Sequence, residues 1–189
     1  AQQTDKPKLL QEYNAIEFGP SAYFGGNNNE LDNKIHVEFL RSITDEFYFQ
    51  LGFSTANSQG ADKFSLNALY YGVGFTDITD FGTGEIDTSI AFNLMNIQDT
   101  QTNFDTDETT TTNYMGQKIS VGINTLMNTM PQIVTKLAVH LNNSEPDGFN
   151  VFYDVGVGYD FNRYLQLNVN VVIGPDNNSN AGIAIRRKF

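Results

Sequence analysis

The sequence predicts an all-β protein, an up-and-down antiparallel transmembrane β-barrel of about ten strands, with eight strands as the alternative count. Two observations carry this prediction: apolar and polar residues alternate along the segments, and the connections between segments alternate between short and long. The predicted strands have about 9–12 residues. That length crosses a bilayer at a tilt of about 45°, whereas strands of soluble proteins more often have about 5–6 residues.

The alternation has a period of two and is clearest in the segment 46–54. There Phe47, Phe49 and Phe53 fall on one face and Gln50 falls on the other, as expected for a strand with one apolar and one polar side. The same pattern recurs along the chain and gives ten predicted strands, near 13–24, 34–41, 46–54, 63–75, 85–96, 114–125, 132–141, 150–160, 163–173 and 183–189.

The connections indicate which ends of the strands lie together. Ser42–Asp45 and Asp160–Arg163 are tight turns. Longer polar connections are expected at 25–33, 55–62, 97–113, 142–149 and 174–180. An even number of strands places both chain ends on the tight-turn side. Aromatic residues concentrate at these same ends and predict an interfacial girdle of Phe39, Phe47, Phe75, Phe81, Tyr159, Phe161, Tyr164 and Phe189.

The last predicted strand ends on Phe189, and two turn-to-strand phrases, 44–53 and 160–167, repeat one hairpin pattern. In this general pattern the chain resembles small bacterial outer-membrane barrels of the OmpA or OmpX type. The resemblance implies a place in the bacterial outer membrane and makes Phe189 an assembly signal. It implies as partners the outer-membrane lipid, lipopolysaccharide and the barrel assembly machinery, with another envelope protein as a further candidate.

The start of the chain lacks the basic and apolar regions of a signal peptide, so we expect a mature chain from which that peptide has been removed. Residues 1–12 are then a periplasmic lead-in and residues 13–189 the barrel domain. The net charge of −11 argues against a nucleic-acid partner, and the absence of cysteine excludes disulfides and thiolate metal sites. No motif indicates a cofactor. The alternative fold is a soluble barrel with the same alternation but with its apolar face inside.

On the membrane interpretation, the polar faces of the strands point into the lumen. Side chains of both charges are among them. The candidate pore-lining residues are Glu17, His36, Glu38, Asp87, Lys118, Lys136, His140, Asp154, Gln166, Asn168, Asn170 and Arg186. Two interpretations stay open: a satisfied network of ion pairs and amides that fills the lumen, or a narrow water-filled pore whose selectivity these charges set.

Two further features allow hypotheses about chemistry. His36 lies beside Glu38, and Ser144 and Glu145 follow His140, so either histidine is a candidate base of a hydrolase at the barrel rim. A possible cation-binding loop holds four carboxylates, Asp99, Asp105, Asp107 and Glu108. Without a catalytic motif or a specific metal motif, we expect no enzyme and no metal. The first hypothesis is a structural or loop-mediated binding role, the alternative is a small passive channel, and the weaker alternative is the hydrolase.

Overall fold

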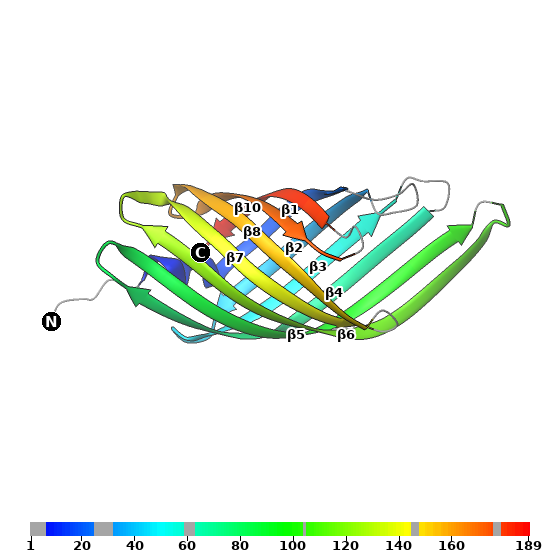
Figure 1. Ribbon diagram of the computed structural model, residues 1–189, viewed down its shortest axis with the longest axis horizontal. Coiled ribbons are helices and arrows are strands. Elements are labelled where there is room, and N and C mark those ends of the chain that lie inside the picture. The colour runs from blue at the N-terminus through cyan, green and yellow to red at the C-terminus, as the bar shows by residue number, and fades with distance from the viewer. Residues whose placement is uncertain (1–6, 25–31, 59–62, 104, 145–147, 176–178) are drawn as a thin grey trace.

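The structure is a computed structural model that describes residues 7–24, 32–58, 63–103, 105–144, 148–175 and 179–189. A short 3-10 helix precedes ten strands (Figure 1). The elements are η1 (Lys8–Tyr13), β1 (Asn14–Phe24), β2 (Asn33–Ser42), β3 (Phe47–Asn57), β4 (Lys63–Asp80), β5 (Gly84–Asn103), β6 (Glu108–Met127), β7 (Met130–Ser144), β8 (Gly148–Asn162), β9 (Leu165–Ile173) and β10 (Ser179–Lys188). No helix among the described residues is long and apolar enough to cross a membrane.

The ten strands form one closed antiparallel barrel in which every strand pairs with its neighbours in the sequence. β1 and β10 close the sheet through a register that runs from Ala15 opposite Lys188 to Phe24 opposite Ser179. The predicted fold and the count of ten strands are confirmed. We call the end that carries η1 and the tight turns the inner end, and the opposite end the outer end.

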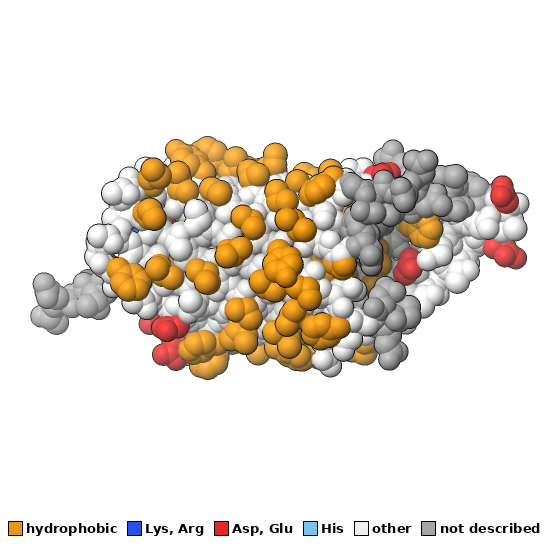
Figure 2. All heavy atoms as spheres, viewed as in Figure 1, with side chains coloured by type: hydrophobic (Ala, Val, Ile, Leu, Met, Phe, Trp, Pro, Cys, Tyr) orange, Lys and Arg blue, Asp and Glu red, His pale blue; other side chains and the backbone are white. Residues whose placement is uncertain are grey.

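The distribution of polarity across the wall separates the two alternative folds. Apolar side chains cover the outside of the barrel (Figure 2), and Val155 and Ile185 are 50% and 56% exposed there. The fully buried side chains inside the barrel include Asp87 and Gln166. This is the reverse of a soluble barrel, whose interior would be apolar. The protein is therefore a transmembrane β-barrel of the outer-membrane type.

The predicted aromatic girdle lies at the inner end of the wall. Phe47 and Phe75 meet edge to face with ring centroids 5.4 Å apart. Phe189 stacks on Phe39 at 5.9 Å, and the guanidinium of Arg41 lies 5.5 Å from the centre of the Phe189 ring. Rings at this level match the membrane interface, where amphipathic and aromatic side chains gather. The role of Phe189 as an assembly signal stays a prediction.

The connection expected at 97–113 is mostly strand, which corrects the sequence prediction. β5 and β6 continue as a paired ribbon until Asn103 faces Glu108, and this hairpin projects beyond the rest of the barrel (Figure 1). Its threonine side chains pair across the two strands, as Thr102 and Thr109 do at 3.2 Å. Alternating hydropathy failed here because the ribbon has polar side chains on both faces.

Two inward glycines allow large rings to lie flat against the inside of the wall. A Cβ atom at Gly74 would lie 2.1 Å from the ring of Tyr48, and one at Gly52 would lie 2.0 Å from the ring of Tyr70. Both contacts are far shorter than a van der Waals contact, so a larger residue at either position would have to displace the tyrosine ring. These two glycines on the polar faces therefore leave room for the large side chains of neighbouring strands inside the barrel.

Replacing Val155, at the middle of β8, with arginine tests the membrane-facing wall. We expect Val155→Arg to lower the free energy of unfolding in lipid vesicles by about 2–4 kcal/mol, because the charge enters the apolar core of the bilayer. The matched Phe161→Arg, at the inner end of the same strand, should cost only about 0–1 kcal/mol. Urea titrations of both variants measure the difference, and equal small effects would favour the soluble barrel.

Candidate functional site

The inner end of the lumen is occupied by η1. Leu9 is only 1% exposed and packs with Leu126 and Val134 of the wall. The backbone N–H groups of Lys8 and Leu9 donate hydrogen bonds to the carboxylate of Glu85 over 2.9 and 2.8 Å. These bonds satisfy donors that the start of a helix leaves unpaired. Part of the predicted lead-in is thus bound inside the barrel.

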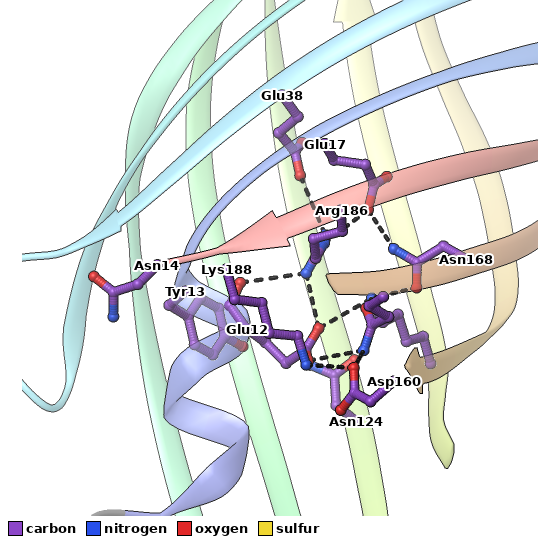
Figure 3. A network of polar contacts seen from close by, with 12 residues as sticks. Glu12, Tyr13, Asn14, Glu17, Glu38, Asn124, Asp160, Asn168, Arg186 and Lys188 are labelled. Atoms are coloured by element: carbon purple, nitrogen blue, oxygen red, sulfur yellow. Dashed lines mark hydrogen bonds and ion pairs between the residues drawn. The ribbon is translucent and has the colours of Figure 1, made fainter. Parts of the chain in front are cut away.

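Glu12 of η1 is at the centre of a buried ion cluster (Figure 3). Its carboxylate lies 3.2 Å from Lys136 Nζ, 2.9 Å from Arg186 Nη1 and 2.5 Å from Lys188 Nζ. Burial by itself raises the pKa of Glu12, but the three cations lower it well below its ordinary value of 4.5. Glu12 therefore stays ionised and joins strands β7 and β10 to η1.

Arg186 links Glu12 to a second carboxylate, that of Glu17 on β1. The Arg186 Nε–H donates to Glu17 over 2.7 Å, while the Asn168 side-chain amide donates to the same carboxylate over 2.5 Å. His36 Nε2 lies 3.2 Å from the other oxygen of Glu17. Since each charge has an oppositely charged or hydrogen-bonding partner, this part of the lumen fits the predicted satisfied network.

A separate carboxylate, Asp87 on β5, is fully buried and is stabilised by neutral donors. It accepts hydrogen bonds from the Tyr13 hydroxyl at 2.5 Å and from the Asn124 amide at 2.8 Å, and also from the hydroxyl of Thr76. Burial and the Asp87 carboxylate raise the pKa of Tyr13 well above its ordinary value. The Tyr13 hydroxyl therefore stays protonated and donates a hydrogen bond to Asp87. η1 is thereby fixed to the wall at a second polar point.

Towards the outer end, the lumen contains a cavity of about 490 Å³. Its lining includes Lys34, Lys118, Glu38 and Asp154. Glu38 accepts a hydrogen bond from the Tyr70 hydroxyl at 2.6 Å and one from the Gln50 amide at 2.7 Å. Lys118 places its Nζ 5.0 Å from the centre of the Tyr70 ring, a cation–π contact. Charges of both signs thus surround open space in this half of the barrel.

His140 lies in the wall of this cavity between a hydroxyl and a carboxylate. Its Nδ1 is 2.8 Å from Ser120 Oγ on the neighbouring β6, and its Nε2 is 3.6 Å from Asp154 Oδ2 on β8. The sequence offers Ser144 and Glu145 as candidate partners of His140. The partners that the structure shows come from the adjacent strands, and Glu145 lies outside the described residues.

All twelve predicted lumen residues face the interior. Asp87 and Gln166 are buried in the packed inner half. The other ten line the outer cavity, namely Glu17, His36, Glu38, Lys118, Lys136, His140, Asp154, Asn168, Asn170 and Arg186. That these residues conduct ions stays a prediction.

Two residues that organise this site are not among the predicted lumen residues. Glu12 is the last residue of the predicted lead-in, and Tyr13 is the first residue of the first predicted strand. Both are buried in the lumen. The available signal was the apolar pair Leu9 and Leu10, which also becomes buried. A short segment with apolar residues and one isolated carboxylate, next to a barrel rich in inward cations, indicates a plug.

The four carboxylates of the predicted cation-binding loop lie on the projecting β5–β6 hairpin. Asp99 is part of β5 and Glu108 begins β6, while Asp105 and Asp107 lie in the turn between them. The last three are exposed. Within the described ranges, no group of three or more His, Asp or Glu residues is arranged to hold a metal ion.

No protein-family model and no curated protein matches this sequence. Solved structures of similar fold include the KdgM porin, which is 11% identical over 93% of this chain and 99% of its own, with a TM-score of 0.47. The β domain of the Bordetella autotransporter BrkA is 12% identical over 93% and 99%, with a TM-score of 0.46. Pseudomonas putida OprB at low pH is 11% identical over 96% and 94%, with a TM-score of 0.39. At these identities the similarity concerns the fold alone.

Removing Glu12 tests the ion cluster. We expect Glu12→Ala to lower the free energy of unfolding at neutral pH by about 3–5 kcal/mol, because three buried cations lose a shared partner. The folded-state pKa of Glu12 lies below its ordinary 4.5, so its contribution is complete above that pH and is lost as the pH falls further.

The difference in stability between wild type and Glu12→Ala should therefore shrink on acidification below the ordinary glutamate range. Denaturant titrations at several pH values measure it, with the exposed Glu46→Ala as the control that should change little. A difference that is small at neutral pH, or that grows with acid, would contradict the cluster.

Proposed function

We propose that this barrel is a small passive channel whose inner end is closed by η1 and whose lumen charges set its selectivity. The observation that supports this most directly is the cavity of about 490 Å³ inside the barrel. Glu12 and Tyr13 of η1 are part of its lining. The cavity is thus bounded at its inner side by the N-terminal segment as well as by the strands.

The dimensions of a ten-stranded barrel support this proposal. An eight-stranded barrel is just wide enough for its own side chains to fill the interior, so two further strands add space that must be filled or left open. Here the inner half is filled with the help of Leu9, Glu12 and Tyr13, which are not strand residues. Withdrawal of η1 would connect the outer cavity to the inner end.

The polar contacts of η1 explain how a plug can be both stable and removable. Each carboxylate that fixes it, including Glu85 at the inner rim, binds groups that water can solvate when the contact opens. The apolar contacts of η1 are fewer. Leu9 packs with Leu126 and Val134, Leu10 is buried, and the Tyr13 ring lies 4.3 Å from that of Tyr48. A structural role remains the less supported hypothesis, because a purely structural barrel does not require such a cavity.

The series Ser120, His140 and Asp154 favours the hydrolase as a second candidate. An imidazole between a hydroxyl and a carboxylate is the arrangement that activates a serine nucleophile. The residues on either side of Ser120 belong to the β6 ladder with β5 and β7, so backbone N–H groups for an oxyanion hole are engaged there. The channel therefore stands first.

Placing a charge at Leu9 tests the channel. Leu9→Asp puts a carboxylate into an apolar contact, and the cost of burying it should release η1 from the wall. We expect a rise of at least about tenfold in the time-averaged conductance of planar bilayers, since about 1.4 kcal/mol shifts an equilibrium tenfold. The matched control, Gln11→Asp, adds the same charge on the exposed side of η1 and should behave as wild type.

Insertion and folding of each variant are confirmed independently by the shift in electrophoretic mobility between unheated and heated samples. If folded Leu9→Asp is as silent as wild type, the channel proposal is wrong, and the barrel is closed by its own side chains. If it conducts, neutralising Lys118 or Asp154 should change the ratio of cation to anion permeability.

The hydrolase hypothesis predicts hydrolysis of p-nitrophenyl esters by the folded protein. Ser120→Ala should then reduce the rate at least about hundredfold, the order of magnitude that loss of an activated group produces. Ser54→Ala, which alters another serine of the cavity wall, serves as the control. Equal rates for the two variants would remove this candidate.

A further inference from the structure

One side of the outer cavity is formed by a contiguous group of apolar side chains, whereas polar and charged side chains make up much of the remaining lining. It is formed by six inward side chains from β3 to β6, which we call the apolar wall: Ala56, Leu66, Ala68, Met95, Ile97 and Tyr114. The strand register makes them contiguous. Ala56 is opposite Leu66, and Ala68, Ile97 and Tyr114 lie side by side across β4, β5 and β6.

The far side of the barrel is mixed, because it presents amide side chains as well as the apolar Val172 and Phe152 to the cavity. β9 and β10 lie opposite β4 and β5 in the closed order of strands. Asn170 of β9 and Asn180 of β10 line the cavity there. Apolar side chains in a polar lumen gain nothing from facing water. Their position is explained if the apolar part of a bound molecule covers them.

Two lysines lie at the edges of the apolar wall. Lys34 on β2 is directly opposite Ala56 in the register. Lys118 on β6 is opposite Asn93, two residues before Met95 on β5. Both lysines line the cavity.

The ammonium groups of these two lysines differ from the others in the lumen. Lys136 Nζ lies 3.2 Å and Lys188 Nζ lies 2.5 Å from a carboxylate oxygen of Glu12. Lys34 and Lys118 have no hydrogen bond or ion pair within the described part of the chain, and Lys118 has only its contact with the Tyr70 ring. A cation in a confined space without a direct partner is suited to receive an anionic group.

The carboxylates that face the same cavity limit the charge of such a ligand. Glu38 is occupied by Tyr70 and Gln50, while Asp154 contacts His140 and accepts a hydrogen bond from Asn170 at 3.4 Å. Both carboxylates attract Lys34 and Lys118 without a direct ion pair among the described residues, and their negative charge disfavours a ligand with several negative charges. The cavity therefore suits one carboxylate rather than two.

We propose that the outer half of the lumen binds an organic monoanion with an apolar body, with its carboxylate at Lys34 and Lys118 and its body against the apolar wall. The cavity volume of about 490 Å³ falls within the range of about 300–1,000 Å³ typical of small-molecule sites. This inference names the solute class for the proposed channel. Transport of this solute class rests on the proposed channel function, whereas its binding requires only the cavity.

The test measures binding of 4-phenylbutanoate to the refolded full chain in lipid nanodiscs, by isothermal titration calorimetry with empty nanodiscs subtracted. The uncharged 4-phenylbutanol has the same apolar body, and acetate has the carboxylate without it. We expect 4-phenylbutanoate to bind more tightly than either analogue. Lys34→Met and Lys118→Met should each weaken its binding by about tenfold and leave 4-phenylbutanol unaffected.

Two more variants separate the parts of the site. Met95→Gln, in the apolar wall, should weaken 4-phenylbutanoate and 4-phenylbutanol alike. Lys8→Met removes a positive charge from η1, outside the cavity lining, and should change neither. Binding no greater than to empty nanodiscs, or equal affinity of wild type and both lysine variants, would overturn the inference.

The outcome is distinguishable from that of the conductance experiment. Lysine-dependent binding with a silent Leu9→Asp variant would support the binding site and refute the channel. Conductance by Leu9→Asp without binding of 4-phenylbutanoate would support the channel and refute this solute class.

Discussion

A sheet inside a bilayer has no water to satisfy the N–H and C=O groups of an edge strand, and the pairing of β1 with β10 removes that edge. Closure then determines the rest of the molecule. Because successive side chains of a strand point to opposite faces, each residue of the closed wall faces either lipid or lumen. The exposed position of Val155 and the buried position of Asp87 are two results of the same rule.

Charges that closure directs inward must be compensated inside a small volume. Arg186 on β10 faces Glu17 on β1 directly, and Lys188 pairs with Asp160 at 2.7 Å, but the ammonium group of Lys136 needs another carboxylate. Glu12 supplies it from η1. The plug thus completes the charge compensation of the wall, because without Glu12 the buried Lys136 would lose the one ion pair that it forms within the described residues. On the outer side of the plug, fewer of the inward charges form direct ion pairs, and the cavity lies there.

The sequence predicted the strands and their faces well, because apolar alternation reports directly on a wall with lipid on one side. The phrase around Phe47, Phe49 and Phe53 is an example: its apolar residues face outward as expected. Alternation gives no signal where both faces are polar, so the sequence predicts a loop where the threonine-rich ribbon of β5 and β6 lies.

The alternation of residues along one strand also does not predict which residues of neighbouring strands are in contact. The partners of His140, Ser120 and Asp154, are 20 and 14 residues away in the sequence but adjacent in the sheet. Register decides which strand residues meet, and register depends on the shear of the closed barrel. Lys34 was not among the predicted lumen residues, and its place beside Ala56 could be known only from pairing.

The ion cluster also joins the two extremities of the fold. Glu12 and Arg186 are separated by 174 positions in the chain, and η1 continues directly into β1, which is itself one side of the seam with β10. A partly assembled sheet that lacks β10 leaves Glu12 without two of its three cations. The complete cluster can therefore form only after the last strand has joined the first. In this protein, the carboxylate of Glu12 has all three of its cations only when the barrel is complete.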